Sequence, residues 1–140
     1  MTADATARAA YLTSLIGRPW SPGASCWHLA CEVEAALWER HLPAVEIPDA
    51  VTWRWMVDTL AAHPERGHWR ELAADPAGLV AAPDGALVLM ARVTQGAHVG
   101  IWLQPEGRVL HADAEAGVAL DAMVTLRARG WARLRFFEPI

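Results

Sequence analysis

Hydrophobic residues recur every three to four positions in the first part of the chain, which is the period of an amphipathic helix. Residues 2–16 carry Leu12 and Leu15 in this pattern and are followed by Gly17 and Pro19, so we predict a helix that ends there. A second helix is predicted to begin at Ser25, because a Ser side chain can accept hydrogen bonds from the free amides of a helix start. Its apolar stripe comprises Cys26, Leu29, Ala30, Val33 and Leu37.

From Gly85 onward apolar and polar residues tend to alternate, which is the period of a β-strand. Strands are predicted at residues 86–93, 97–103, 108–113, 118–121 and 131–137, separated by turns that contain Gly. Helices followed by a mostly antiparallel sheet, here of about five strands, are typical of the α+β class. The sequence therefore predicts an α+β fold.

The length of 140 residues favours one domain over residues 1–140, because a chain of this size forms a single hydrophobic core. Residues 43–83 differ in character from the rest. They combine several prolines with tryptophans, and only residues 49–61 have a helical pattern. We expect residues 43–83 to form an insertion on the core scaffold. The tryptophans concerned, which belong in the core or on a wall that faces a substrate, are Trp53, Trp55 and Trp69.

All twelve basic residues are Arg, and the chain contains no Lys. Schiff-base chemistry, a Walker-type phosphate loop and a Ser-Lys dyad each need a lysine amine and are excluded. The net charge of -4 argues against a nucleic-acid partner, since such proteins present a basic face to phosphates. The arginines near the end of the sequence are expected at a solvated edge; they are Arg127, Arg129, Arg133 and Arg135.

The sequence also bears on membranes and export. No apolar run approaches the roughly 18 to 20 residues of a membrane span, so we expect none. Residues 1–16 lack the charged start and Leu-rich stretch of a signal peptide. We therefore expect cytoplasmic synthesis without a signal peptide.

Cys26 is the first candidate for chemistry. It directly follows the predicted helix start at Ser25, where unpaired backbone amides favour a thiolate. The other interpretation of Cys26 is a small hydrophobic residue on the buried stripe of its helix. Cys31 lies further along the same helix, too far from Cys26 for a disulfide, and is expected to be a structural thiol.

Two histidines in the predicted sheet favour the chemical interpretation. A hairpin closed with Leu103 opposite Arg108 puts Gly100 across from His111 and His98 diagonal to it. Diagonal side chains lie within roughly 7 Å between Cβ atoms, so the two imidazoles can share a hydrogen bond. We expect Gly100 to leave room for an approaching group. A thiol, an imidazole that takes its proton and a polar group that orients this imidazole form a nucleophilic triad.

Several segments together resemble one protein family. They are residues 15–20 (LIGRPW), 23–29 (GASCWHL), 83–89 (PDGALVL), 98–103 (HVGIWL) and 109–112 (VLHA). They resemble the NlpC-type cell-wall cysteine peptidases, most of all the small forms encoded with phage tails and related particles. The resemblance spans residues 8–137.

This resemblance implies a papain-like α+β fold with the nucleophile at a helix N-terminus. It maps the catalytic triad onto Cys26, His98 and His111, and we expect Trp20, Ser25 and Gly100 to contact the substrate. The chain departs from the family pattern at four positions. Ser25 replaces the usual Asp before the nucleophile, and His28 replaces a small residue two positions after it. Ala86 stands in place of an Asp, and Trp20 in place of a Tyr. The indole of Trp20 can donate a hydrogen bond but can neither accept one nor ionise.

Metal binding is an alternative use of the same residues. Cys26, His28 and Cys31 are close in sequence, but on a helix their side chains leave in different directions. A zinc site of Cys26, His98 and His111 would use ordinary zinc ligands and stays open. Our leading prediction is that the chain binds neither a metal nor a cofactor.

The leading hypothesis is a cysteine peptidase that hydrolyses amide bonds of peptidoglycan stem peptides. The resemblance implies a bond between D-γ-glutamate and a diamino acid, partner proteins in a phage tail or particle, and a place in the virion or release at lysis. The alternatives are a non-catalytic tail-assembly or adaptor domain and another acyl-thioester enzyme, an amidase or transferase, on the same triad. His63 and His68 lack a metalloprotease pattern and are expected at the surface.

Overall fold

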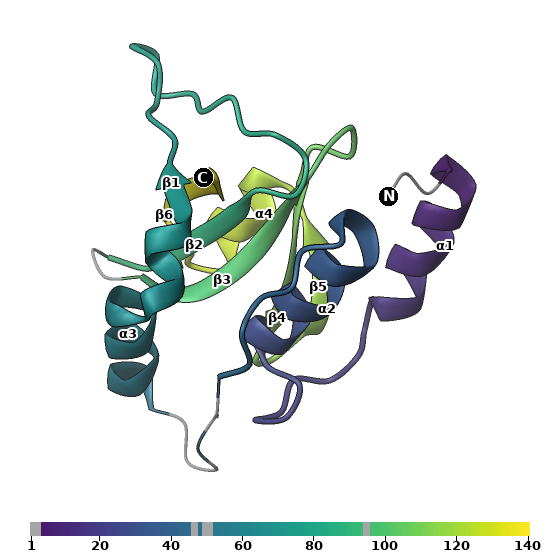
Figure 1. Ribbon diagram of the computed structural model, residues 1–140, viewed down its shortest axis with the longest axis horizontal. Helices are drawn as coiled ribbons and strands as arrows, with labels where there is room; N and C mark the ends of the chain where they lie inside the picture. The colour runs from purple at the N-terminus through teal and green to yellow at the C-terminus, as the bar shows by residue number, and fades with distance from the viewer. Residues whose placement is uncertain (1–3, 46–47, 49–51, 94–95) are drawn as a thin grey trace.

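The computed structural model describes residues 4–45, 48, 52–93 and 96–140. Helices pack on both faces of one sheet (Figure 1). The helices are α1 (Ala5–Leu15), α2 (Cys26–Trp38), α3 (Trp53–Ala62), the 3-10 helix η1 (Pro64–His68) and α4 (Met123–Ala128). The strands are β1 (Trp69–Glu71), β2 (Leu87–Ala91), β3 (Gly96–Leu103), β4 (Arg108–Asp113), β5 (Gly117–Asp121) and β6 (Arg133–Pro139). The predicted α+β class and the antiparallel sheet are confirmed.

The sheet has six strands in the order β1-β6-β2-β3-β4-β5, and every neighbouring pair is antiparallel. The strand that comes last in the chain, β6, therefore lies between β1 and β2. The sequence analysis missed β1, because its three residues are too few to show alternation. It also missed α4, whose N-cap Ala122 offers no side chain to the free amides and gives no start signal.

The predicted boundaries shift at several elements. The helix predicted at residues 2–16 begins after the cap Asp4, whose carboxylate accepts from the amide of Ala7. The helix predicted at residues 49–61 begins after the cap Thr52, and residues 49–51 lie outside the described part of the chain. The predicted strands 86–93 and 131–137 correspond to the shorter β2 and to a β6 displaced towards the C-terminus.

The two faces of the sheet carry separate hydrophobic clusters, because successive side chains of a strand point to opposite faces. We call them the α2 face and the α4 face after the helices that cover them (Figure 1). On the α2 face, Leu89, Val99 and Leu110 pack with Leu29 and Val33 of α2. On the α4 face, the cluster comprises Val88, Met90, Val109, Leu126, Trp131 and Phe136.

Helix α2 begins where its sequence predicts. The Ser25 hydroxyl accepts from the amide of His28, and the His28 ring accepts from the amide of Ser25, which completes a reciprocal cap. The helix ends at Glu39 in the left-handed conformation, with φ of 56°. Its apolar stripe is buried, and each Leu or Val removed from water stabilises the fold by about 1.5–3 kcal/mol.

Helix α1 is tied to the turn between β3 and β4 by one arginine. The guanidinium of Arg8 donates to both carboxylate oxygens of Asp84 at 2.6 and 2.8 Å and to Glu106 at 3.0 Å. It also donates to the backbone oxygen of Gln104. Since Gln104 and Glu106 belong to the turn, the N-terminal helix holds the tip of the hairpin that carries His98 and His111.

The segment predicted as an insertion, residues 43–83, contains α3, η1 and β1. Strand β1 pairs with β6, from Trp69 opposite Pro139 to Glu71 opposite Phe137. The segment therefore supplies one edge of the sheet and, through α3, part of the layer on the α2 face.

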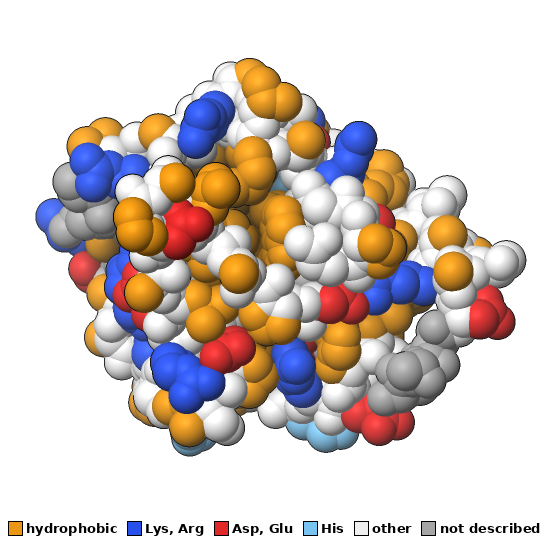
Figure 2. Space-filling model, turned by 90° about the horizontal axis from the view of Figure 1, so that it is seen from above, with side chains coloured by type: hydrophobic (Ala, Val, Ile, Leu, Met, Phe, Trp, Pro, Cys, Tyr) orange, Lys and Arg blue, Asp and Glu red, His pale blue; other side chains and the backbone are white. Residues whose placement is uncertain are grey.

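Charged side chains are dispersed over the molecule. On the face drawn in Figure 2, arginines lie among acidic and hydrophobic side chains. Arg129 pairs with Asp121 at 2.7 Å and Arg135 with Glu71 at 2.6 Å, while Arg127 and Arg133 are exposed. In the described residues, no helix combines the length and the apolar character that crossing a membrane would need.

Candidate active site

Cys26 is the first residue of α2, and its side chain is 1% exposed. Burial raises the pKa of its thiol to about 11, although hydrogen bonds with the backbone of Val99 and Trp27 act in the opposite direction. The sequence analysis expected the helix start to favour a thiolate. The backbone of the helix start does lower the pKa, but loss of water around the sulfur is the larger effect, so the net direction is upward.

The second cysteine behaves as a structural thiol. Cys31 is half-buried, and its Sγ lies 3.7 Å from the backbone oxygen of Pro43. Burial raises its pKa to about 11 as well. Both cysteines are free, as predicted.

The two sheet histidines meet as the hairpin register predicts. Strands β3 and β4 pair with Leu103 opposite Arg108, and Nε2 of His98 lies 2.9 Å from Nδ1 of His111. The two rings are edge to face, with centroids 5.1 Å apart. His111 is fully buried and His98 nearly so. The sequence therefore located a buried imidazole pair correctly.

A carboxylate that the sequence analysis did not single out completes this pair. Nε2 of His111 lies 2.8 Å from Oδ2 of Asp121, and Nε of Arg129 donates to the same oxygen at 2.7 Å. Asp121 lies diagonal to His111, which is opposite Ala119 in β5. The diagonal rule that paired the two histidines would have found Asp121 if it had been applied to the next hairpin.

These contacts assign the protons of both rings. The ionised carboxylate of Asp121 can only accept, so Nε2 of His111 must carry a proton and donate it. Nδ1 of a neutral His111 then accepts, so Nε2 of His98 must donate. Nδ1 of His98 is left without a proton. The chain from Asp121 thus fixes His98 in the tautomer that can accept a proton at Nδ1.

His98 is held in a hydrophobic setting. Its ring stacks on Trp131 with centroids 4.8 Å apart, and the guanidinium of Arg92 lies 4.2 Å from the centroid of the Trp131 ring. Burial lowers the pKa of His98 to about 3, and the neighbouring His111 contributes in the same direction. His98 is therefore neutral at physiological pH in this structure.

The thiol and the imidazole pair lie on different faces of the sheet. Cys26 belongs to the cluster of the α2 face together with Val99. His98 precedes Val99 in β3, is opposite Met90 and stacks on Trp131, both of which belong to the α4 face. No hydrogen bond joins the sulfur to either imidazole in the described part of the chain. The structure brings together two of the three predicted triad residues, because α2 packs on the face to which Val99 points.

The Cys26 thiol and the imidazole pair both lie near the point where pairing between β3 and β4 ends. The amide of Trp102 donates to Ala86 and its carbonyl accepts from Gly85, both on the β2 side of β3. Because successive residues of a strand direct their backbone groups to opposite sides, those of Val99 and Ile101 face β4. The pairing of β3 with β4 extends from Leu103 only to Ile101, which is opposite Leu110. The backbone of Val99 is thus not paired with β4, and it lies close enough to the Cys26 sulfur to act on the pKa of the thiol.

The residues predicted to contact substrate are differently placed. Ser25 is buried, and its hydroxyl lies 2.9 Å from Nδ1 of His28. Trp20 is partly buried against the cluster of the α2 face. A Cβ built on Gly100 would lie 2.6 Å from Cγ1 of Val109 and 3.0 Å from Cε of Met90. The space beside Gly100, expected to be open for a substrate, is therefore filled by these side chains.

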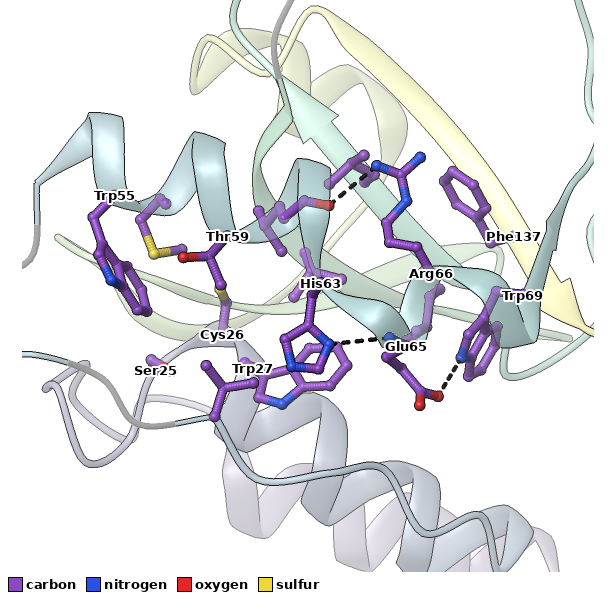
Figure 3. A pocket seen from close by; sticks show the side chains of 16 residues that line it. Ser25, Cys26, Trp27, Trp55, Thr59, His63, Glu65, Arg66, Trp69 and Phe137 are labelled. Carbon is purple, nitrogen blue, oxygen red and sulfur yellow. Dashed lines mark hydrogen bonds between the residues drawn. The ribbon is translucent and has the colours of Figure 1, made fainter.

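A cavity of about 80 Å³ lies between α2, α3 and the α2 face of the sheet, and Cys26 lines it (Figure 3). The predicted surface residue His63 also lines this cavity, whereas His68 is exposed as predicted. His63 was missed because it lies in an irregular segment where no hydrophobic period shows which way a side chain points.

The zinc alternative required Cys26, His98 and His111 on one ion. The thiol lies on the other face from the imidazoles, and His28 is used in capping α2. The residues that the structure describes include no cluster of three or more His, Cys, Asp or Glu side chains arranged to hold a metal ion.

Comparisons with known proteins add no family assignment. Neither a scan against protein-family models nor a search of curated proteins found a significant match to the chain.

Proposed function

We propose that the chain is a cysteine hydrolase of the NlpC type, with a papain-like arrangement, that cleaves amide bonds in peptidoglycan stem peptides. The observation that carries the proposal is the hydrogen-bonded chain from Asp121 through His111 to His98. It leaves Nδ1 of His98 as a proton acceptor, which is the state that a general base requires. Cys26, at the start of α2, is the nucleophile.

In the proposed reaction, Nδ1 of His98 takes the thiol proton of Cys26, and the thiolate attacks the amide carbonyl. The backbone amide of Cys26 donates to the oxyanion, as unpaired amides at helix starts can. His98 then protonates the leaving amine, and water hydrolyses the thioester. His111 orients His98 throughout, while Asp121 and Arg129 keep His111 in its tautomer.

The mechanism requires the thiol and His98 to approach each other when substrate binds. Pairing between β3 and β4 ends at Ile101, so the start of β3, which pairs with β2 but not with β4, has fewer backbone pairs to hold it in place. A displacement there breaks no β3–β4 backbone hydrogen bond. Substrate binding would also have to offset the dehydration that raises the pKa of the thiol.

The bond cleaved is proposed from the family resemblance alone, as a link between D-γ-glutamate and a diamino acid. The same resemblance supports a place in a phage tail or related particle, or release at lysis. Peptidoglycan stem peptides and particle proteins would then be the partners.

A second candidate function is a non-catalytic domain that keeps the fold for assembly. The observation that favours it is the separation of the buried, protonated thiol from both imidazoles. Such a domain would keep His98, His111 and Asp121 as a buried polar network that contributes to stability only.

Digestion of purified peptidoglycan distinguishes these functions. The wild-type protein and the Cys26→Ala variant are incubated with walls of several chemistries, and released muropeptides are identified by mass spectrometry. We expect release by the wild type, none by Cys26→Ala, and undiminished release by the matched control Cys31→Ala. Equal profiles for wild type and Cys26→Ala on every wall would refute the hydrolase and favour the assembly domain.

A further inference from the structure

One arginine near His98 has no carboxylate partner in the described part of the chain. Most arginines of the protein pair with an acidic side chain, as Arg129 does with Asp121 at 2.7 Å. Arg92, the exposed residue that directly follows β2, instead donates to the backbone oxygen of Arg129 at 2.9 Å. A guanidinium has five N–H donors in a planar fork, so Arg92 retains donors and a positive charge for an anion.

Arg92 lies close to the proposed general base. Its guanidinium is 4.2 Å from the centroid of the Trp131 ring, and the His98 ring stacks on the same indole with centroids 4.8 Å apart. The guanidinium is therefore within about 9 Å of the His98 ring. Burial lowers the pKa of His98 to about 3, and the charge of Arg92 acts in the same direction, as expected of a cation at this separation.

The indole of Trp131 supplies another donor beside Arg92. Trp131 is 7% exposed, and its Nε1 has no hydrogen-bond partner among the described residues. A buried N–H without an acceptor is costly, so a ligand oxygen that accepts from it would stabilise the complex. Because the side chain of Arg92 is exposed, it can move to admit this oxygen. A cationic fork beside an unpaired indole N–H is complementary to a carboxylate.

We propose that Arg92 and the indole of Trp131 form a carboxylate-binding site for the amine half of the substrate. The inference rests on the proposed function, in which His98 returns its proton to the leaving amine and so lies beside that half. The glutamyl half is attached to Cys26 in the thioester and stays outside this site.

Distance decides which carboxylate of the amine half fits the site. The α-carboxyl carbon is two bonds from the scissile nitrogen, about 2.5 Å away, whereas a carboxyl carbon at the end of a diamino acid side chain can be six bonds away, about 7.5 Å when extended. Only the longer reach suits groups that are separated by an indole ring, as His98 and Arg92 are within about 9 Å. The site therefore selects a diamino acid whose side chain ends in a carboxylate over lysine, whose terminal ammonium Arg92 would repel.

Binding to the inactive Cys26→Ala variant measures this preference without turnover. The probe is γ-D-glutamyl-meso-diaminopimelate, and the matched ligand is the same dipeptide with the carboxylate at the end of the side chain converted to an amide. NMR follows the indole N–H signal of Trp131, which is assigned by its loss in Trp131→Phe. We expect a saturable shift with the carboxylate dipeptide and an affinity at least about tenfold lower for the amide, the factor that one charge-assisted hydrogen bond contributes.

Substitutions of Arg92 in the same background give a second readout. Arg92→Gln should lower the affinity for the carboxylate dipeptide at least about tenfold and leave that for the amide unchanged. Arg92→Lys, which keeps the charge but not the fork, should be intermediate. The matched Arg108→Gln, at an exposed position where β4 begins, should change neither affinity.

Equal affinities for the two dipeptides, an unmoved indole signal or discrimination that survives Arg92→Gln would overturn the proposal. The comparison of the two dipeptides uses a single protein, so it decides even if an Arg92 variant fails to fold. Carboxylate-selective binding together with wild-type protein that releases no muropeptide would retain the site and reject the hydrolase. Muropeptide release by the wild type without carboxylate-selective binding would retain the hydrolase and reject the site.

Discussion

The polar side chains on the two faces of the sheet differ in how they are hydrogen-bonded. On the α4 face, His98, His111 and Asp121 form one connected chain, and Arg129 closes its end. On the α2 face, Cys26, Thr59 and His63 line a largely apolar cavity, and no hydrogen bond joins these three side chains to one another in the described part of the chain. A connected network fixes protons in place and makes each member depend on the others. The α4 face is thus the more constrained of the two.

The strongest contrast between the faces should come from removing one imidazole from each. His111→Ala leaves the buried N–H of His98 without an acceptor, removes one of the two donors to the Asp121 carboxylate and opens a cavity, so we expect a loss of about 3–5 kcal/mol in the free energy of unfolding. The matched His63→Ala removes a half-buried ring and should cost about 1 kcal/mol or less. Urea unfolding measures both. Similar losses for the two variants would mean that the α4 face is not the more constrained one.

A smaller effect is expected when the carboxylate becomes an amide. Asp121→Asn removes the charge that Arg129 and His111 share, and we expect a loss of about 2 kcal/mol. Nitrogen-15 NMR of the imidazoles reads the tautomers directly. In the wild type, the proton should be on Nε2 of both His98 and His111, and in the variant His111 should no longer be held in a single tautomer. A wild-type proton on Nδ1 of His111 would contradict the assignment.

The smallest expected effect concerns Glu34, a fully buried carboxylate of α2. Arg40 lies 3.4 Å from its Oε2, while Oε1 has no partner in the described residues. Burial raises the pKa of Glu34 from 4.5 to about 8. A raised pKa means that its stabilising contribution is fully present below about pH 4.5 and is lost as the pH rises through about 8.

The Glu34→Gln variant tests this pH dependence. The variant should have a flatter unfolding free energy between pH 5 and 8.5 and should be about 1–2 kcal/mol more stable than the wild type at the upper end. Thermal unfolding across this range measures the difference. A wild-type stability that increases towards pH 8.5 would show that Glu34 is ionised and well paired.

Local patterns in the sequence located much of this arrangement. The alternation in residues 97–103 and 108–113, with a short turn between them, predicted the hairpin register and hence the contact of His98 with His111. The same reasoning also carries to Asp121 in the following hairpin. These inferences succeed because diagonal neighbours on one sheet face depend only on register and the two-residue period of a strand.

The relation between Cys26 and His98 could not be predicted in the same way. A period states which residues share a face, but it does not state which face a helix covers. That choice depends on how α2, α3 and the edge strand β1 pack together, and β1 itself has too few residues to leave a pattern. The cavity beside His63 depends on the same packing, so no local signal could have revealed it.

The position of β6 has a consequence for how the protein is made. Because β6 lies between β1 and β2, β1 has no neighbour in the sheet until β6 has been synthesised. The hydrogen bonds of Arg8 likewise cannot form until Asp84 and Glu106 have been synthesised. The consecutive strands β2 to β5 can pair as they emerge, whereas the edge formed by β1 is completed only by the last strand. The pairing of β1 with β6 thus joins segments far apart in the sequence, and contacts of this kind slow folding.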